Sequence, residues 1–112
     1  MLCVRDIATS RTVRYATSVV KISIIIPTYN EIAEIGATVE CASRLHPHEI
    51  IVVDGGSTDG TLEAVRELPC QLLESPPGRG LQQNRGADAA TGDVLFFLHA
   101  DCHPVIDALT QV

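Results

Sequence analysis

Apolar positions between residues 21 and 98 fall into short continuous runs separated by stretches with helical spacing. The continuous runs are rich in β-branched and aromatic residues, which is typical of buried strands. The stretches between them repeat apolar side chains every three or four positions, which indicates amphipathic helices. Strands that alternate with helices through short connections favour a parallel sheet with helices on its faces. The expected strands are 21–27, 49–54, 70–74 and 93–98, and the expected helices are 31–45, 61–68 and 81–90.

Length and composition indicate one small domain. The chain has 112 residues, of which 46% are hydrophobic and 20% are charged. This balance excludes the disordered class, and the length leaves little room for a second domain. The strongest apolar runs are five residues each, whereas a membrane-spanning helix needs about 20. We expect residues 1–20 to form a loosely ordered N-terminal extension and residues 21–112 to form the domain.

The charge balance narrows the class of partner. Fourteen Asp and Glu residues against eight Lys and Arg residues give a formal net charge of −6. An acidic chain repels a nucleic-acid backbone, so we expect no nucleic-acid partner. Backbone N–H groups or a bridging divalent cation can still bind a phosphorylated small molecule. The four cysteines form no CxxC pair, and we interpret them as reduced thiols in a cytoplasmic protein.

Unusual polar residues gather just after the expected strands, and in parallel sheets ligands bind at these carboxyl ends. Thr28 and Tyr29 offer a hydroxyl and an aromatic face suited to a base or ribose. Alternatively, Tyr29 covers an edge of the core while Asn30 caps the following helix. Arg79 lies between two glycines, where the backbone can approach a ligand and the guanidinium can bind a phosphate. The alternative for Arg79 is an exposed side chain in a flexible loop.

The turn after the second strand, 54–61, begins with a carboxylate that is costly to bury without partners. Either the N–H groups of the turn or an N–H group of a ligand must satisfy Asp54. No lysine follows the glycines, so the segment is not a P-loop. Asp59 is expected to cap the next helix rather than to contact a ligand.

The segment 99–103 after the fourth strand combines imidazole, carboxylate and thiol groups. Alternation allows His99 and Asp101 to point the same way, where both can face a cation. Imidazole and carboxylate suit Mn²⁺, and the carboxylate also suits Mg²⁺. Two alternatives are a zinc site built from Asp101, Cys102 and His103, and a structural role without a metal.

Taken in order, four segments resemble the N-terminal half of a family 2 glycosyltransferase with the GT-A fold. These segments are IIIPTYNE, EIIVVDGGSTDGT, QNRGADAATGD and VLFFLHAD, and all of them lie within residues 22–103. The forms GRGLQQNRGA and LHAD further resemble a bacterial subgroup linked to arsenosugar biosynthesis. The resemblance implies an α/β fold, a Rossmann-like GT-A half domain whose mostly parallel sheet has about four strands. It also implies a nucleotide-diphosphate-sugar donor, a divalent cation (Mn²⁺ or Mg²⁺) and transfer with inversion at the anomeric carbon.

The resemblance also implies a role for individual positions. Asp54 would face the base or ribose, and Arg79 would lie near the diphosphate. Asp101 would be the last acid of the DxD-type metal motif, and His99 stands where that motif has its first acid. Gly55 stands where the family often has a second acid. The implied nucleotide-sugar-binding residues are Pro27, Thr28, Tyr29, Glu31, Asp54, Gly55, Arg79, Gln82 and Asn84, and the implied metal ligands are Asp101 and His99.

In this family the catalytic base and the acceptor pocket come from a second half, beyond the DxD strand. Residues 104–112 offer no candidate for that base, so we expect a donor-binding half, truncated at its C-terminus, without an identifiable catalytic residue. An uncovered sheet edge would then favour self-association. The alternatives are a non-catalytic nucleotide-sugar-binding module, an inactive remnant, or an unrelated Rossmann-like binder, against which the missing GxGxxG counts.

Overall fold

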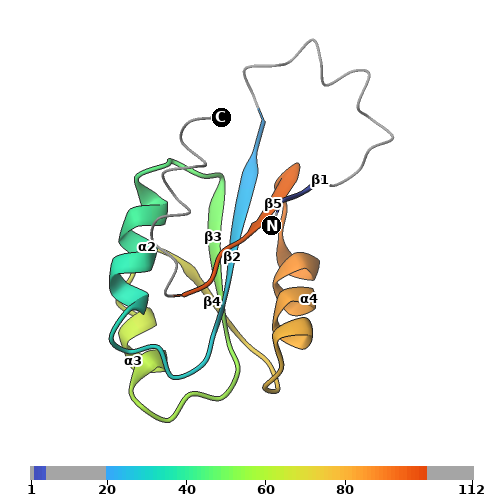
Figure 1. Ribbon diagram of the computed structural model, residues 1–112. Coiled ribbons are helices and arrows are strands. Elements are labelled where there is room, and N and C mark those ends of the chain that lie inside the picture. The colour runs from blue at the N-terminus through green and yellow to red at the C-terminus, as the bar shows by residue number, and fades with distance from the viewer. Residues whose placement is uncertain (1, 5–19, 101–112) are drawn as a thin grey trace.

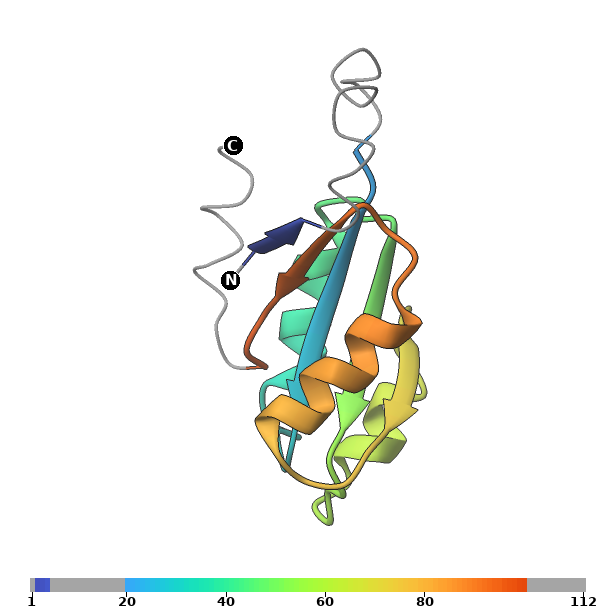
Figure 2. The same cartoon turned by 90° about the vertical axis from the view of Figure 1, so that its right-hand side faces the viewer.

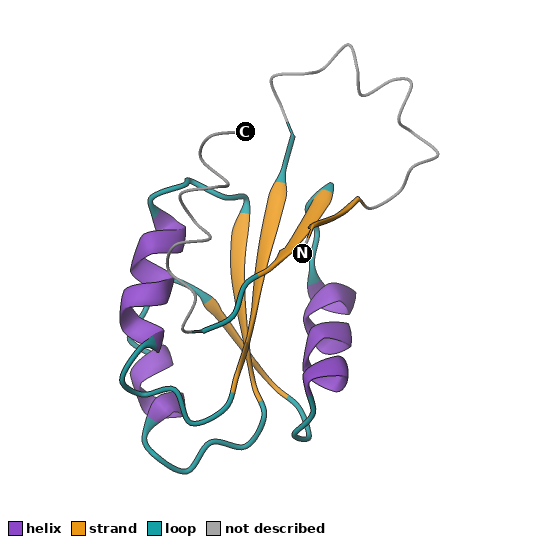
Figure 3. Cartoon of the chain, viewed as in Figure 1, coloured by secondary structure: helices purple, strands orange, loops and turns teal. Residues whose placement is uncertain are grey.

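A mostly parallel sheet of five strands lies between two layers of helices (Figures 1 and 3). The structure, a computed structural model, describes residues 2–4 and 20–100. The strand order is β1-β5-β2-β3-β4, in which the last four are parallel and β1 runs antiparallel to β5. The predicted α/β class with a mostly parallel sheet is confirmed. The strands are β1 (Leu2–Val4), β2 (Ile22–Thr28), β3 (Glu49–Asp54), β4 (Gln71–Glu74) and β5 (Val94–Phe97), and the helices are α2 (Ile35–Ser43), α3 (Thr61–Val65) and α4 (Arg79–Ala89).

Both faces of the sheet are covered, by α2 and α3 on one side and by α4 on the other (Figures 1 and 2). Successive side chains of a strand point to opposite faces, so alternate residues of β2 enter different cores. Ile24 and Ile26 pack in the core that contains Ile35 and Val39 of α2, whereas Ile25 packs in the core on the α4 side. This two-sided burial explains the continuous apolar runs of the sequence. None of the helices in the described part of the chain is long and apolar enough to cross a bilayer.

The main differences from the predicted elements lie at their ends. Residues 2–4 of the expected loose extension form β1, because the open edge of β5 offers backbone groups with which they pair. The rest of that extension, 5–19, lies outside the described residues. α2 begins at Ile35 rather than at residue 31, and Asn30 does not cap it, because the Asn30 side chain binds the connection after β3. α4 begins at Arg79, earlier than the predicted residue 81.

α4 approaches the sheet closely at Gly86. A Cβ atom at this position would lie 2.5 Å from Ile25 Cγ2 and 3.2 Å from Val53 Cγ2. Both neighbours are branched and fully buried, so neither side chain can move aside cheaply. Gly86 therefore sets the distance between the sheet and the helix that carries Arg79.

Gly86→Ala is expected to lower the free energy of unfolding by about 1–3 kcal/mol, because the added methyl group overpacks the core. This loss exceeds the gain in helix propensity, which is at most about 1 kcal/mol. Urea unfolding followed by circular dichroism measures the change. Gly80→Ala in the same helix is the matched control, since a Cβ atom at Gly80 meets nothing within 4 Å. Equal effects of the two substitutions would contradict the close approach at Gly86.

Glu49 ties the amino ends of β2 and β3 to the connection between α4 and β5. Its Oε2 accepts hydrogen bonds from Ser23 Oγ at 2.6 Å, from Thr91 N at 2.6 Å and from Thr91 Oγ1 at 3.2 Å. Ser23 Oγ in turn accepts a hydrogen bond from Gly92 N at 2.9 Å. Burial alone would raise the pKa of Glu49, but these bonds and the nearby His48 hold the pKa below its usual value.

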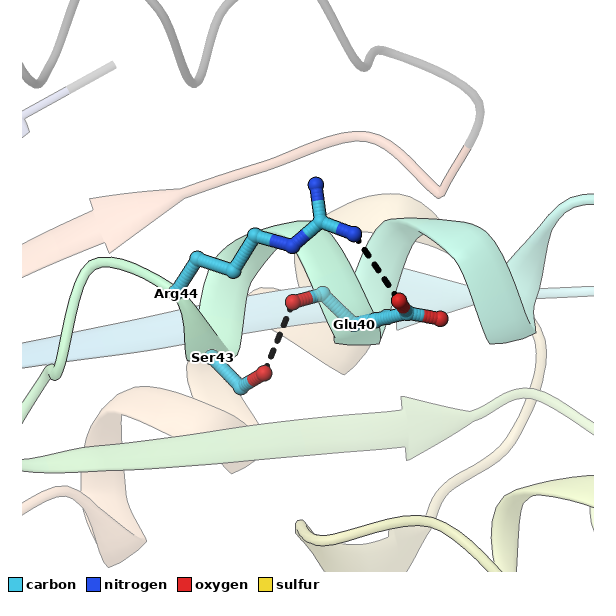
Figure 4. A network of polar contacts seen from close by, with 3 residues as sticks. All are labelled: Glu40, Ser43 and Arg44. Carbon is cyan, nitrogen blue, oxygen red and sulfur yellow. Dashed lines mark hydrogen bonds and ion pairs between the residues drawn. The ribbon is translucent and has the colours of Figure 1, made fainter.

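α2 carries a contrasting ion pair on its exposed side (Figure 4). Arg44 Nη2 lies 2.9 Å from Glu40 Oε1, and Ser43 Oγ donates a hydrogen bond to Glu40 O at 2.7 Å. The Arg44 and Glu40 side chains are 69% and 68% exposed, so solvent screens their attraction. Such a pair contributes little to stability.

Glu49→Gln should destabilise the chain by about 1–2 kcal/mol at neutral pH, because a neutral amide forms weaker hydrogen bonds than a carboxylate. With a lowered pKa in the folded state, the carboxylate adds stability above its unfolded pKa and loses it as the pH falls through the folded value. The difference between parent and variant should therefore shrink below about pH 4.5. Urea unfolding at several pH values measures this difference.

Glu40→Gln is the control for this experiment, and its effect should stay below about 0.5 kcal/mol because Glu40 is exposed. A destabilisation by Glu49→Gln that is the same at acidic and neutral pH would contradict the proposed role of the Glu49 charge.

Candidate functional site

A cavity of about 210 Å³ lies at the carboxyl ends of β2 and β5, beside the first turn of α4. This is the edge of a parallel sheet at which ligands bind. Of the predicted site residues, Asp54, Gly55 and Asn84 do not line it, and Asp101 lies outside the described residues. The lining consists of Pro27, Thr28, Tyr29, Glu31, Arg79, Gln82, His99 and Ala100.

The end of β2 supplies a buried hydroxyl and an exposed aromatic ring. Thr28 is 1% exposed, and its Oγ1 donates a hydrogen bond to Ile26 O at 3.1 Å, so the hydroxyl serves its own strand. Tyr29 is 51% exposed and lines the cavity. An aromatic side chain at such a cavity is of the kind on which a base can stack.

Arg79 and His99 come from different connections and meet at the cavity. Arg79 Nη1 lies 2.8 Å from His99 Nδ1 and 3.2 Å from His99 Nε2. A guanidinium only donates hydrogen bonds, so the imidazole nitrogen at 2.8 Å is the acceptor. The contact holds a fixed positive charge at the cavity, beside the N-terminus of α4, whose N–H groups also favour an anion. Arg79 is exposed, as the alternative expected, but it lies in the first turn of α4 rather than in a loop.

The Asp54 carboxylate is satisfied by the turn that it begins. The side chain belongs to a residue that is 1% exposed, and its Oδ2 accepts hydrogen bonds from Gly56 N at 3.0 Å and Ser57 N at 2.9 Å. Its Oδ1 accepts one from Ser57 Oγ at 2.6 Å. Of the two alternatives for Asp54, the structure favours the turn N–H groups over a ligand N–H group. The implied contact of Asp54 with a base or ribose finds no support in this arrangement, because the residue does not line the cavity.

Asn30 and Ser57 join the connection after β2 to the connection after β3. Asn30 N donates a hydrogen bond to Ser57 Oγ at 2.8 Å, and Asn30 Oδ1 accepts one from Thr58 N at 2.8 Å. Asn30 adopts the left-handed conformation with φ 52°, which asparagine tolerates better than most residues. This bridge was not predicted. The hydroxyl-rich segment 57–61 is the feature of the sequence that could have indicated it.

Asp59 adds a second bridge between the same connections and binds the first residue of α3, but the N-cap of α3 is Gly60 rather than the predicted Asp59. Its Oδ1 accepts hydrogen bonds from Thr61 N at 3.0 Å and from the Thr61 hydroxyl, and its Oδ2 accepts one from Ile32 N at 3.3 Å. The Thr61 hydroxyl is the main reason that the pKa of Asp59 is lowered. Thr61 Oγ1 also accepts a hydrogen bond from Glu31 N at 3.0 Å, so the backbone of a cavity-lining residue is fixed from the neighbouring connection.

Gln82 lines the cavity, but its amide group is engaged by the backbone. Nε2 donates hydrogen bonds to Thr28 O and Val53 O, each at 2.9 Å, and Oε1 accepts one from Gly78 N at 3.3 Å. Asn84 is exposed on α4 away from the lining, so its role in binding stays a prediction.

His99 is the predicted metal ligand that the structure places at the cavity. Its partner Asp101 lies outside the described residues, as do Cys102 and His103 of the zinc alternative. Within residues 2–4 and 20–100, no three His, Cys, Asp or Glu side chains are grouped so that they could hold a metal ion. The assignment of the metal ligands therefore stays a prediction.

Comparison with known proteins agrees with this fold. Residues 23–112 match the family model described as Glycosyl transferase family 2. The chain belongs to glycosyl transferase family 2. This family 2 chain is 34% identical over 94 residues to the glycosyltransferase AglE of Haloferax volcanii, covering 74% of this chain and 31% of that protein. It is 37% identical over 94 residues to the dolichol-phosphate mannosyltransferase of Pyrococcus furiosus, covering 75% of this chain and 27% of that protein.

Solved structures of glucosyl-3-phosphoglycerate synthase from Mycobacterium tuberculosis share the fold. The complex with Mn²⁺, uridine diphosphate (UDP) and glucosyl-3-phosphoglycerate has a TM-score of 0.68 and 28% identity, and the match covers 77% of this chain and 35% of that one. The complex with Mg²⁺ and UDP has a TM-score of 0.70 and 27% identity, with coverage of 83% and 38%. The predicted family and the GT-A fold are confirmed. The family 2 chain spans about a third of the length of these relatives.

Ser57→Ala is expected to lower the free energy of unfolding by about 1–2 kcal/mol, because it removes a donor to buried Asp54 and an acceptor for Asn30 N–H. Urea unfolding measures this change. Thr58→Ala is the matched control, since Thr58 contributes its backbone N–H to the bond with Asn30. Unchanged stability of Ser57→Ala would show that the bridge between the connections contributes nothing.

Proposed function

We propose that this family 2 chain binds the nucleoside diphosphate part of a nucleotide-sugar donor in the cavity at the ends of β2 and β5. The placement of Arg79 carries the proposal, because its guanidinium lies at the cavity beside the N-terminus of α4. A diphosphate needs fixed positive charge and N–H donors, and a nucleoside needs an aromatic face such as that of Tyr29. The structural likeness to synthases solved with UDP supports this choice of ligand.

Each of the lining residues would contact a different part of the nucleotide-sugar donor. Arg79 would exchange its bond to His99 for the diphosphate, since charge-assisted contacts to phosphate are stronger than a bond to neutral imidazole. Tyr29 would stack on the nucleoside, and Glu31 would accept hydrogen bonds from its hydroxyl groups. Asp54 would act indirectly, through the turn that it orders. The sugar would then pass, with inversion, to an acceptor hydroxyl deprotonated by a general base.

His99 and Asp101 are the residues that we propose to hold a divalent cation. The imidazole of His99 fits this role by its place at the cavity and by its suitability for Mn²⁺. The carboxylate of Asp101, two residues further along, suits both Mn²⁺ and Mg²⁺. A bound cation would supply positive charge to the departing diphosphate. The synthase structures with Mn²⁺ or Mg²⁺ beside UDP support a cation in the family.

Calorimetric titration of UDP into the chain tests the proposal, with EDTA, Mg²⁺ or Mn²⁺ present. Binding should strengthen with either cation and more with Mn²⁺, because imidazole is a poor ligand for Mg²⁺. Arg79→Ala should weaken binding about tenfold or more in all three conditions, since it removes a direct phosphate contact. Asp101→Asn should remove most of the gain from the cations, and His99→Asp should shift the preference toward Mg²⁺.

Arg66→Ala is the matched control, because Arg66 is exposed at the end of α3 and does not line the cavity. It should bind UDP as the parent does. If neither UDP nor the other nucleoside diphosphates bind the parent in any condition, the proposed function is wrong. If Asp101→Asn responds to cations as the parent does, the assignment of the metal ligands is wrong.

A further inference from the structure

We propose that Gln82 is a positioning residue that fixes the segment carrying Arg79 against the ends of β2 and β3, and that Gly55 is glycine to leave room for its amide. The positioning of Arg79 follows from the contacts of Gln82 alone. Its consequence for ligand binding rests on the proposed function.

Gln82 connects three backbone segments through one buried amide group. The residue is 5% exposed, and its Nε2 donates to Thr28 O at the end of β2 and to Val53 O near the end of β3. Its Oε1 accepts the hydrogen bond of Gly78 N at 3.3 Å. An amide has two donor hydrogens and one acceptor oxygen, so every part of this group is engaged. The backbone carbonyl groups at the ends of β2 and β3 thus accept hydrogen bonds from a side chain of α4.

Gly78 makes the bond to Gln82 important for Arg79. Gly78 has φ 139°, a conformation that other residues rarely adopt, and it directly precedes Arg79 at the start of α4. Glycine in such a segment is free to adopt many other conformations unless a contact selects one. The contact with Gln82 Oε1 selects the conformation from which Arg79 reaches the cavity.

Gly55 packs directly against the Gln82 amide. A Cβ atom at Gly55 would lie 2.9 Å from Gln82 Cδ, 2.9 Å from Oε1 and 3.0 Å from Nε2. The end of a glutamine side chain normally moves away at little cost, but this one would break three hydrogen bonds to do so. Any side chain at position 55 is therefore incompatible with the Gln82 contacts, and the two positions form one unit.

Hydrogen exchange of single amides, measured by NMR on the ligand-free chain, tests the positioning role. Gln82→Met retains the length of the side chain and removes its hydrogen bonds, so the Gly78 amide should exchange about tenfold faster. The Ser75 amide is the internal control, because it donates to Asp54 O at 2.9 Å without involving Gln82. An unchanged rate at Gly78 would overturn the proposal, and so would equal acceleration at Gly78, Ser75 and the β3 amides, which would indicate general destabilisation.

A double-mutant comparison in urea tests the shared space. Gly55→Ala should destabilise the parent clearly but should cost much less in the Gln82→Ala background, where the amide is gone. Gly36→Ala is the matched control, since a Cβ atom at Gly36 meets nothing within 4 Å. Equal costs of Gly55→Ala in the two backgrounds would overturn the claim that Gly55 and Gln82 form a unit.

Titration of UDP separates this inference from the proposed function. If the parent binds UDP, Gln82→Met should weaken UDP about tenfold and uridine, which carries no phosphate, much less. Equal weakening of both ligands, or of neither, would overturn the link to Arg79. If the parent binds no nucleoside diphosphate, the proposed function fails, while the exchange and stability measurements still decide the positioning role of Gln82.

Discussion

Backbone carbonyl groups at the carboxyl ends of β2 and β3 need hydrogen-bond donors beyond the point where the ladder stops. A buried carbonyl without a partner is costly, so the donors must come from whatever segments follow the strands. Thr28 O accepts from Gly55 N and from Gln82 Nε2, each at 2.9 Å, and Val53 O accepts from the same Gln82 group. α4, which supplies the Gln82 donor, also supplies Arg79 and Gln82 to the cavity lining. The hydrogen bonds that satisfy the ends of β2 and β3 therefore also help to position the candidate site.

The two ends of the sheet solve this problem with different chemistry. At the amino end, the Glu49 carboxylate gathers donors from Ser23 and Thr91, and nothing in this arrangement faces the candidate site. At the carboxyl end, the neutral Gln82 amide donates to strand carbonyl groups, and the Ser57 hydroxyl donates to the Asp54 carboxylate. The Glu31 carboxyl group lines the cavity, whereas the Asp54 carboxylate is buried in its own turn and does not.

Local sequence patterns predict the secondary structure of each segment. They do not predict the contacts between segments that lie far apart in the chain. Continuous apolar runs predict the four parallel strands because burial on both faces leaves a mark on every residue of the run. The position of Arg79 between glycines and the aromatic ring of Tyr29 likewise predict ligand contacts from the local sequence. Gln82 binds carbonyls 54 and 29 positions away, and Asn30 binds a turn 28 positions away. Nothing in the neighbours of these residues specifies such partners.

Contacts between distant segments also explain why some helices and strands begin or end at other residues than predicted. Asparagine before an amphipathic stretch is a typical N-cap, so Asn30 was a reasonable candidate. In the fold it forms hydrogen bonds with Ser57 and Thr58 of the nearby turn instead. β1 has three residues, too few for a pattern, and it forms because β5 has an edge on which it can pair. Both outcomes are decided by tertiary contacts, which override local preference when the two disagree.

The electrostatics of the cavity connect its parts to the acidic character of the whole chain. With a net charge of −6, long-range attraction cannot bring an anionic ligand to this chain, so the site must supply its own positive charge. Arg79 supplies one fixed charge at the cavity, and the carboxyl group of Glu31 on the same lining opposes it. A diphosphate carries more negative charge than one guanidinium offsets, which is the physical reason to place cation ligands at His99 and Asp101. With the phosphates bound by the proposed cation and Arg79, the Glu31 carboxyl group would contact the hydroxyl groups of the nucleoside rather than the diphosphate.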